Sequence, residues 1–139
     1  MTQTVAIPDA FARGVRVINH RWFRGLCIVV SLTMASLLFL EAHAIARVNL
    51  VPEFMHRIEH ISYFGAMAAL LAHGLGRRGY WVAGYAILLV GALDEWHQLY
   101  VPGRNGSIYD WLVDLLGVSA ALLVYRYAAV RLVDGWKPA

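Results

Sequence analysis

The chain has 139 residues, a net charge of +3 and a mean hydropathy of +0.55. Hydrophobic residues make up 60% of it and charged residues only 15%, whereas soluble domains carry about 25% charged residues. A soluble fold of this length cannot bury so much apolar surface, which excludes an ordinary globular domain. The basic residues form no single patch, so nucleic acid is not expected as a partner. The single cysteine, Cys27, excludes an intrachain disulfide and a multi-cysteine metal site.

The 24 N-terminal residues differ from the rest of the chain. Apolar residues recur there at helical spacing while arginines fall elsewhere on the helical wheel: Phe11, Val15, Ile18 and Trp22 against Arg13 and Arg16. This pattern predicts a short amphipathic helix on the cytoplasmic membrane surface, with a frayed tail as the alternative. A cleaved signal peptide is a further alternative for the apolar run that follows. The long charged leader and the interruptions at Glu41 and His43 argue against cleavage.

Four apolar segments then follow, at residues 25–46, 53–75, 79–98 and 108–130. Each reaches the roughly 20 residues that a helix needs to cross a bilayer. Their apolar residues do not alternate as in a membrane β-barrel, so the predicted fold is all-α, a polytopic membrane domain of four transmembrane helices over 25–130. Proline and glycine mark the connections at Pro52, 74–79 and 102–106. Residues 131–139 are predicted to form a cytoplasmic tail.

The arginines and the lysine predict the orientation of the helices. If the N-terminus is cytoplasmic, nine of the basic residues lie on that side: Arg13, Arg16, Arg21, Arg24, Arg77, Arg78, Arg126, Arg131 and Lys137. Three lie on the other side: Arg47, Arg57 and Arg104. This bias predicts that both termini are cytoplasmic and that the segment 94–114 lies at the extracytoplasmic surface of the cytoplasmic membrane.

Segment 94–114 gathers ionisable residues that the apolar runs avoid. Asp94, Glu95 and Gln98 share one face of the third helix. Acids near the end of a spanning helix usually face a protein interior or a wet cavity. Arg104, in the following turn, is suited to bind a carboxylate or a phosphate at two points. It could instead pair with Asp94 or Glu95 and hold the hairpin together.

The fourth helix begins with a capping pattern. Ser107 and Asp110 have capping-box spacing, so Asp110 has a structural explanation beside a functional one. Asp114 lies one turn deeper on the same face and needs a partner in the interior. Gly117, three residues further, should allow the backbone of an earlier helix to approach closely.

The second helix carries a histidine-rich face. His56, His60 and Tyr63 follow one another at spacings of four and three, flanked by Arg57 and Glu59. His60 is the catalytic candidate because the predicted topology brings it to the same surface as segment 94–114. The other histidines are interpreted as structural or as weaker candidates: His43, His73 and His97.

The sequence contains none of the usual motifs for a metal site or a catalytic nucleophile. Oxygen and nitrogen ligands are present, at His60, Asp94, Glu95, His97, Asp110 and Asp114. No HExxH or paired-cysteine spacing occurs, so no resident metal and no cofactor are predicted. GxSxG, P-loop and GxGxxG motifs do not occur either, and Ser107 is interpreted as a helix cap more readily than as a nucleophile.

Taken together, these residues resemble the VanZ-like family of small bacterial membrane proteins, over roughly residues 25–130. The shared pattern is HxxY on one helix, DExxQ on the next, a PGR turn, a downstream aspartate and a glycine on the last helix: His60, Tyr63, Asp94, Glu95, Gln98, Pro102, Gly103, Arg104, Asp110 and Gly117. The chain departs from the family at Asp114, where Asn is common, and at Arg57, where Lys is frequent. The resemblance implies a cell-envelope role; the founding member is associated with resistance to teicoplanin.

We therefore expect an extracytoplasmic site that binds or modifies a lipid-linked cell-envelope substrate. The expected catalytic residues are His60, Asp94 and Glu95. The expected substrate-binding residues are Arg104, Gln98, Tyr63, Asp110, Asp114 and Arg57. Non-enzymatic binding of a lipid or antibiotic, and a scaffold in which the polar residues only join helices, are the alternatives. A proton-coupled transporter is a further alternative. It would need a homo-oligomer, because four helices are few for transport.

Overall fold

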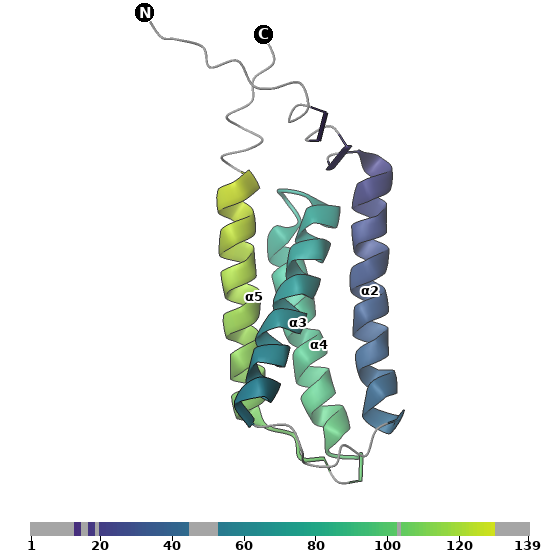
Figure 1. The fold of residues 1–139 in the computed structure, drawn as a ribbon, viewed down its shortest axis with the longest axis vertical. Coiled ribbons are helices and arrows are strands. Elements are labelled where there is room, and N and C mark those ends of the chain that lie inside the picture. The colour runs from purple at the N-terminus through teal and green to yellow at the C-terminus, as the bar shows by residue number, and fades with distance from the viewer. Residues whose placement is uncertain (1–12, 15–16, 19, 45–52, 103, 130–139) are drawn as a thin grey trace, which may run out of the picture.

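The structure is a computed structural model that describes residues 13–14, 17–18, 20–44, 53–102 and 104–129. Within these ranges long helices and their turns make up the fold, and no strand occurs. The helices are α2 (Arg21–Ala44), α3 (Glu53–Leu75), α4 (Tyr80–Gln98) and α5 (Ile108–Ala129). They run alternately up and down, so consecutive helices are antiparallel (Figure 1). The all-α prediction is confirmed, whereas most of the predicted N-terminal amphipathic helix and the tail 131–139 lie outside the described residues.

Local signals explain where the helices meet their turns. Gly76 ends α3 with a φ of +79°, a left-handed conformation that favours glycine, and its N–H donates to the Ala72 carbonyl at 2.8 Å. At the start of α5, the Asp110 N–H donates to Ser107 Oγ at 3.4 Å. Ser107 therefore caps the helix as its spacing predicted.

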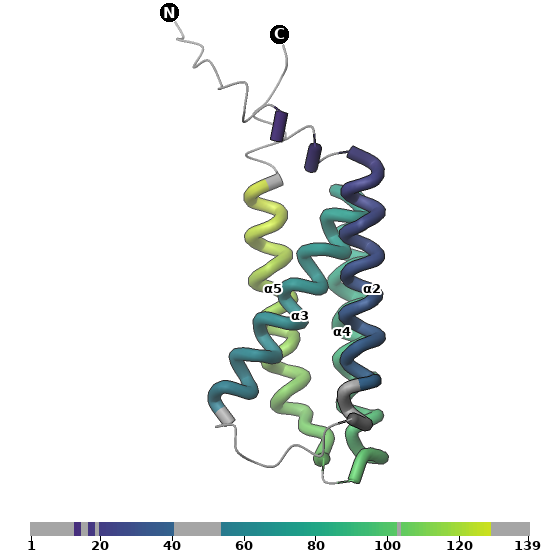
Figure 2. The backbone as a smooth tube through the Cα atoms, turned by 45° about the vertical axis from the view of Figure 1, so that its right-hand side comes forward, coloured from purple at the N-terminus to yellow at the C-terminus, as the bar shows by residue number. Residues whose placement is uncertain are grey.

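Helix α3 is the centre of the bundle and packs against α2, α4 and α5. It runs obliquely across α5 (Figure 2). At the crossing the two backbones nearly touch, since a Cβ atom at position 117 would lie 2.5 Å from the Ile61 carbonyl oxygen. Gly65 of α3 faces the same point, 3.1 Å from the Gly117 oxygen by the same construction. The predicted close approach at Gly117 is confirmed, with α3 as the partner helix.

A single apolar cluster fills the middle of the bundle. Its largest members are Phe64 and Met67 from α3 and Val118 from α5, each almost fully buried. Small residues of α3 and α4, such as Ala68 and Ala83, let the helices approach. At the α2 side, Ser31 Oγ donates to the Met67 carbonyl at 3.0 Å. This core packs α3 against α5 next to the polar residues described below.

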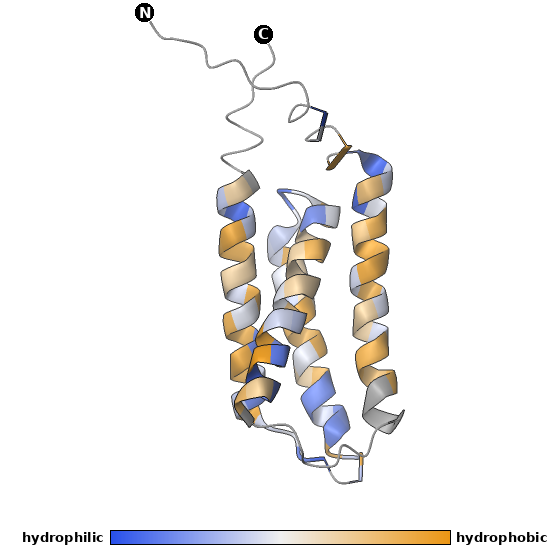
Figure 3. Cartoon of the chain, viewed as in Figure 1, coloured by the Kyte–Doolittle hydropathy of each residue, from blue (hydrophilic) through white to orange (hydrophobic). Residues whose placement is uncertain are grey.

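Much of the outside of the bundle is apolar. Large hydrophobic side chains are exposed on every helix, among them Val29, Ile58, Leu89 and Leu123. Figure 3 shows that apolar residues run along most of each helix. Contiguous apolar surface of this extent is rare on soluble monomers. The segments Arg21–Leu40 and Ile108–Ala128 are long and apolar enough to cross a membrane.

Candidate functional site

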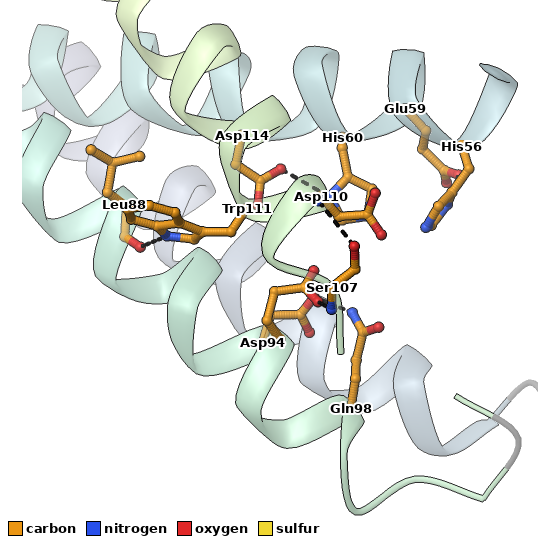
Figure 4. A network of polar contacts seen from close by, with 11 residues as sticks. His56, Glu59, His60, Leu88, Asp94, Gln98, Ser107, Asp110, Trp111 and Asp114 are labelled. Carbon is orange, nitrogen blue, oxygen red and sulfur yellow. Dashed lines mark hydrogen bonds and ion pairs between the residues drawn. The ribbon is translucent and has the colours of Figure 1, made fainter. Parts of the chain in front are cut away.

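Polar side chains gather at the end of the bundle where α4 joins α5. The buried polar and charged residues are Ser31, His60, Asp94, Glu95, Gln98 and Asp114. All of them except Ser31 lie between α3, α4 and α5 near this end and are called here the polar cluster. Figure 4 shows His60, Asp94, Gln98 and Asp114 turned toward one another. The cluster brings together all three residues predicted to be catalytic and two of those predicted to bind substrate.

His60 and Asp114 form the deepest contact of the polar cluster. His60 Nδ1 and Asp114 Oδ1 share a hydrogen bond of 2.8 Å between α3 and α5. Their side chains are 8% and 1% exposed, so the contact is shielded from solvent. The ring of His56, one turn earlier on α3, meets the His60 ring edge-on with centroids 4.6 Å apart. Asp114 thus has the interior partner that its sequence position required.

Asp94 and Gln98 pair within α4. Gln98 Nε2 donates to Asp94 Oδ2 at 2.7 Å, as their spacing of four residues predicted. Both side chains are buried. The amide holds one carboxylate oxygen of Asp94 in a defined position within the polar cluster (Figure 4).

Glu95 joins the end of α4 to the start of α5. Its Oε2 accepts the Ser107 backbone N–H at 2.6 Å. In a capping box the Asp110 carboxylate would accept that N–H from Ser107. Here the Glu95 carboxylate accepts it in place of Asp110. The half-buried Asp110 carboxylate makes no hydrogen bond or ion pair within the described part of the chain. Asp110 is therefore available to a ligand, while Glu95 has a structural duty that the sequence did not predict.

Arg104 lies near this end of the bundle and is half-buried. Its Nε atom is buried and forms no hydrogen bond among the described residues. Arg104 also forms no ion pair with Asp94 or Glu95, so the alternative in which it pins the hairpin is not observed. The guanidinium can therefore meet an anionic group.

Two predicted substrate-binding residues point elsewhere. The Tyr63 hydroxyl donates to the Met34 carbonyl of α2 at 2.7 Å, on a different side of α3 from His60. Arg57 is exposed on the outside of α3. His97 also faces α2, where its ring meets Phe39 at a centroid distance of 5.6 Å. Tyr63 and Arg57 lie near His60 in sequence on α3, but their side chains are separated from it in space.

The sequence did not predict the role of Trp111 in positioning the site. Its Nε1 donates to the Leu88 carbonyl at 3.0 Å, which fixes the indole between α5 and α4 (Figure 4). A Cβ at Gly91 would lie 3.4 Å from the indole and 3.0 Å from Asp114 Oδ2, so this glycine makes room for both side chains. No local signal in the sequence marks this role, because the acceptor of the indole N–H lies on another helix.

An apolar pocket of about 380 Å³ opens beside the polar cluster, between α4 and α5. Glu95 and Ser107 contribute its polar wall, and the rest is aliphatic or aromatic: Ala92, Trp96, Leu99, Gly106, Ile108 and Trp111. Its volume lies in the range of small-molecule sites, about 300–1,000 Å³. The pocket can hold an apolar chain whose polar end meets Glu95.

The polar cluster can perform two kinds of chemistry. A histidine oriented by a buried carboxylate is an arrangement that accepts and returns protons. One ring nitrogen of His60 and one carboxylate oxygen each of Glu95 and Asp114 also lie within 4.8 Å of one another. These are the donor types that coordinate divalent metal ions.

Comparison with known proteins agrees with the architecture. Residues 26–131 match the model of a family described as VanZ/LLP1, which covers most of the chain. Searches of the curated proteins and of the solved structures found no match. The family match joins the apolar exterior and the two membrane-length helices as evidence for a membrane protein. The chain belongs to the VanZ-like family of membrane proteins.

Proposed function

We propose that this protein binds and modifies a lipid-linked cell-envelope substrate at the extracytoplasmic surface of the cytoplasmic membrane. The observation that carries the proposal is the apolar pocket, which opens directly against Glu95 of the polar cluster. A ligand that fits both places has an apolar chain and a polar headgroup. Lipid carriers of envelope precursors have this construction.

The surroundings of the pocket favour a ligand that arrives from the bilayer. Trp96, Leu99 and Ile108 line the pocket and are themselves strongly exposed on the outside of the bundle. A lipid chain can therefore enter sideways without crossing water. Tryptophan is also enriched at the depth of lipid headgroups, where the phosphate of such a ligand would lie.

The polar side chains would divide between binding the phosphate of the headgroup and transferring a proton. Arg104, whose Nε has no hydrogen-bond partner among the described residues, would bind a phosphate through its planar guanidinium. His60, oriented by Asp114 at 2.8 Å, would act as the general base or acid. Asp94, held by Gln98, would stabilise the positive charge that forms on His60 during proton transfer.

The test uses purified full-length protein in lipid nanodiscs, incubated with a polyprenyl diphosphate-linked sugar. Binding is measured by native mass spectrometry and conversion by liquid chromatography with mass spectrometry. We expect wild-type protein to bind and convert the lipid. Arg104→Ala should lose binding, and His60→Gln should lose conversion. Arg78→Ala is the matched control, because this arginine is exposed in the turn between α3 and α4, at the other end of the bundle.

The other outcomes decide against parts of the proposal. If wild-type protein binds the lipid without forming product and Arg104→Ala does not bind it, the protein is a binding module. The same assay with teicoplanin would then test for an antibiotic ligand. Equal binding by wild type and Arg104→Ala would contradict the proposed headgroup site. If wild-type protein neither bound nor converted the lipid, the polar cluster would have only the scaffold role of joining α3, α4 and α5.

A further inference from the structure

We infer that His60, Glu95 and Asp114 form a binding site for one divalent transition-metal ion. The three residues come from three different helices, α3, α4 and α5, and meet only in the folded bundle. One donor atom from each lies within 4.8 Å of the others. Donor atoms that share one ion are about 3–4 Å apart, since each lies about 2.0–2.2 Å from the metal. Side-chain shifts of roughly 1 Å would bring this trio onto a common ion.

Each carboxylate of the trio uses one oxygen for a structural contact and keeps the other unused. Glu95 Oε2 accepts the Ser107 N–H, and Asp114 Oδ1 meets His60 Nδ1. The second oxygens, Glu95 Oε1 and Asp114 Oδ2, are buried and have no hydrogen-bond partner among the described residues. These residues are only 9% and 1% exposed, so solvent does not readily satisfy the free oxygens. A buried acceptor without a partner is costly, and a cation between the two would remove that cost.

Charge balance points to the same conclusion. Asp94, Glu95 and Asp114 are three buried acids, and within the described residues no lysine or arginine forms an ion pair with any of them. His60 is their single ion-pair partner in that part of the chain, through Asp114. Acids inside a membrane protein pair with a cation or surround an ion path. A divalent ion would supply the positive charge that the protein's own side chains do not supply.

The donor set indicates which metal fits. One imidazole nitrogen with two carboxylate oxygens, and no thiolate, suits Zn²⁺ or Mn²⁺ better than Cu⁺. Cys27, on α2, is not part of the trio. The 2.8 Å hydrogen bond between His60 Nδ1 and Asp114 Oδ1 already holds these two side chains together. The absence of an HExxH spacing is no obstacle, because the ligands converge from separate helices.

The ion would also account for how an acidic site accepts an anionic headgroup. Asp94, Glu95, Asp110 and Asp114 would repel a lipid phosphate, whereas Arg104 would attract it. A bound divalent ion would reverse the sign of the local charge. This role in headgroup binding rests on the proposed function, whereas the binding of the ion by the three side chains does not.

Metal binding is therefore tested without any lipid substrate. Tag-free full-length protein in detergent is stripped with a chelator, dialysed against Zn²⁺ and measured by inductively coupled plasma mass spectrometry. We expect one Zn²⁺ per chain. His60→Gln, Glu95→Gln and Asp114→Asn should each weaken binding by at least about tenfold. Glu59→Gln and His73→Gln control for an exposed carboxylate on α3 and for a histidine at the other end of the bundle, and both should bind like wild type.

A second measurement keeps the test independent of folding defects. X-ray absorption at the zinc edge should show nitrogen and oxygen ligands without sulfur, and Zn²⁺ should raise the unfolding temperature of wild type but not of Glu95→Gln. Size-exclusion chromatography confirms that each variant is folded. Zinc content at the level of a protein-free detergent blank would overturn the inference. So would sulfur ligation, or undiminished binding by folded Glu95→Gln and Asp114→Asn. Metal binding without lipid conversion would contradict only the proposed function.

Discussion

His60 and Asp114 are 54 residues apart in sequence and share a 2.8 Å hydrogen bond that joins α3 to α5. The bond lies next to the close contact between the two helix backbones at Ile61 and Gly117. We therefore expect a change at the helix crossing to affect the polar contact, and the reverse.

The first prediction concerns the energetic coupling of this pair. His60→Ala and Asp114→Ala should each lower the free energy of unfolding by about 3 kcal/mol, because each leaves a buried polar group without its partner. The double variant should lose less than the sum, with a coupling of about 1–3 kcal/mol. Reversible unfolding in mixed detergent micelles measures all four proteins. Losses that add to within about 0.5 kcal/mol would show that the two side chains act independently.

The second prediction concerns the helix crossing. Gly117→Ala would place a Cβ 2.5 Å from the Ile61 carbonyl oxygen, and neither backbone can move without disturbing the core. We expect a destabilisation of about 1–3 kcal/mol in the same unfolding assay. Gly25→Ala is the matched control, because nothing lies within 4 Å of its added Cβ. It should be neutral or stabilising by up to about 1 kcal/mol. Equal effects of the two substitutions would refute the close approach.

The third prediction separates the structural duty of Glu95 from its charge. Glu95→Gln can still accept the Ser107 N–H through its amide oxygen, whereas Glu95→Ala cannot. Hydrogen–deuterium exchange of the amides at 104–107 should therefore be near the wild-type rate in Glu95→Gln and faster in Glu95→Ala. The associated loss of stability in Glu95→Ala should be about 1–3 kcal/mol. Identical exchange in both variants would mean that this contact does not hold the hairpin.

The fourth prediction concerns the apolar pocket. Ala92 lines it, so Ala92→Trp should fill the space that an apolar chain would occupy. We expect binding of a long-chain polyprenyl diphosphate-linked sugar to fall by roughly tenfold or more, the loss of a few buried methylene contacts. Leu89→Trp, at an exposed position of α4 outside the pocket, should bind like wild type. If Ala92→Trp binds the lipid normally, the apolar chain of the lipid lies elsewhere.

The fifth prediction concerns orientation in the membrane. In a Cys27→Ala background, Asn105→Cys lies in the α4–α5 turn and Arg78→Cys in the α3–α4 turn; both positions are exposed. With both termini cytoplasmic, a membrane-impermeant maleimide should label position 105 but not position 78 in right-side-out vesicles. Detergent should make both equally reactive. The reverse labelling pattern would invert the topology and place the polar cluster on the cytoplasmic side.

The sequence alone was sufficient for the architecture. Long apolar runs interrupted by glycine and proline predicted the four helices close to their observed limits, because helix formation in an apolar chain is a local property. The capping role of Ser107, the pairing of Asp94 with Gln98 and the close approach at Gly117 followed from spacing along one helix. Membership of the VanZ-like family followed from the same motifs.

Only the tertiary structure decided how these helices turn toward one another. Tyr63 follows His60 by three residues, yet its hydroxyl reaches α2 while His60 reaches Asp114 on α5. Glu95 takes the Ser107 N–H that spacing had assigned to Asp110. Both outcomes depend on the rotation of each helix about its axis and on the crossing at Gly117. A hydropathy pattern determines neither in a chain that is apolar both toward the lipid and toward its own core.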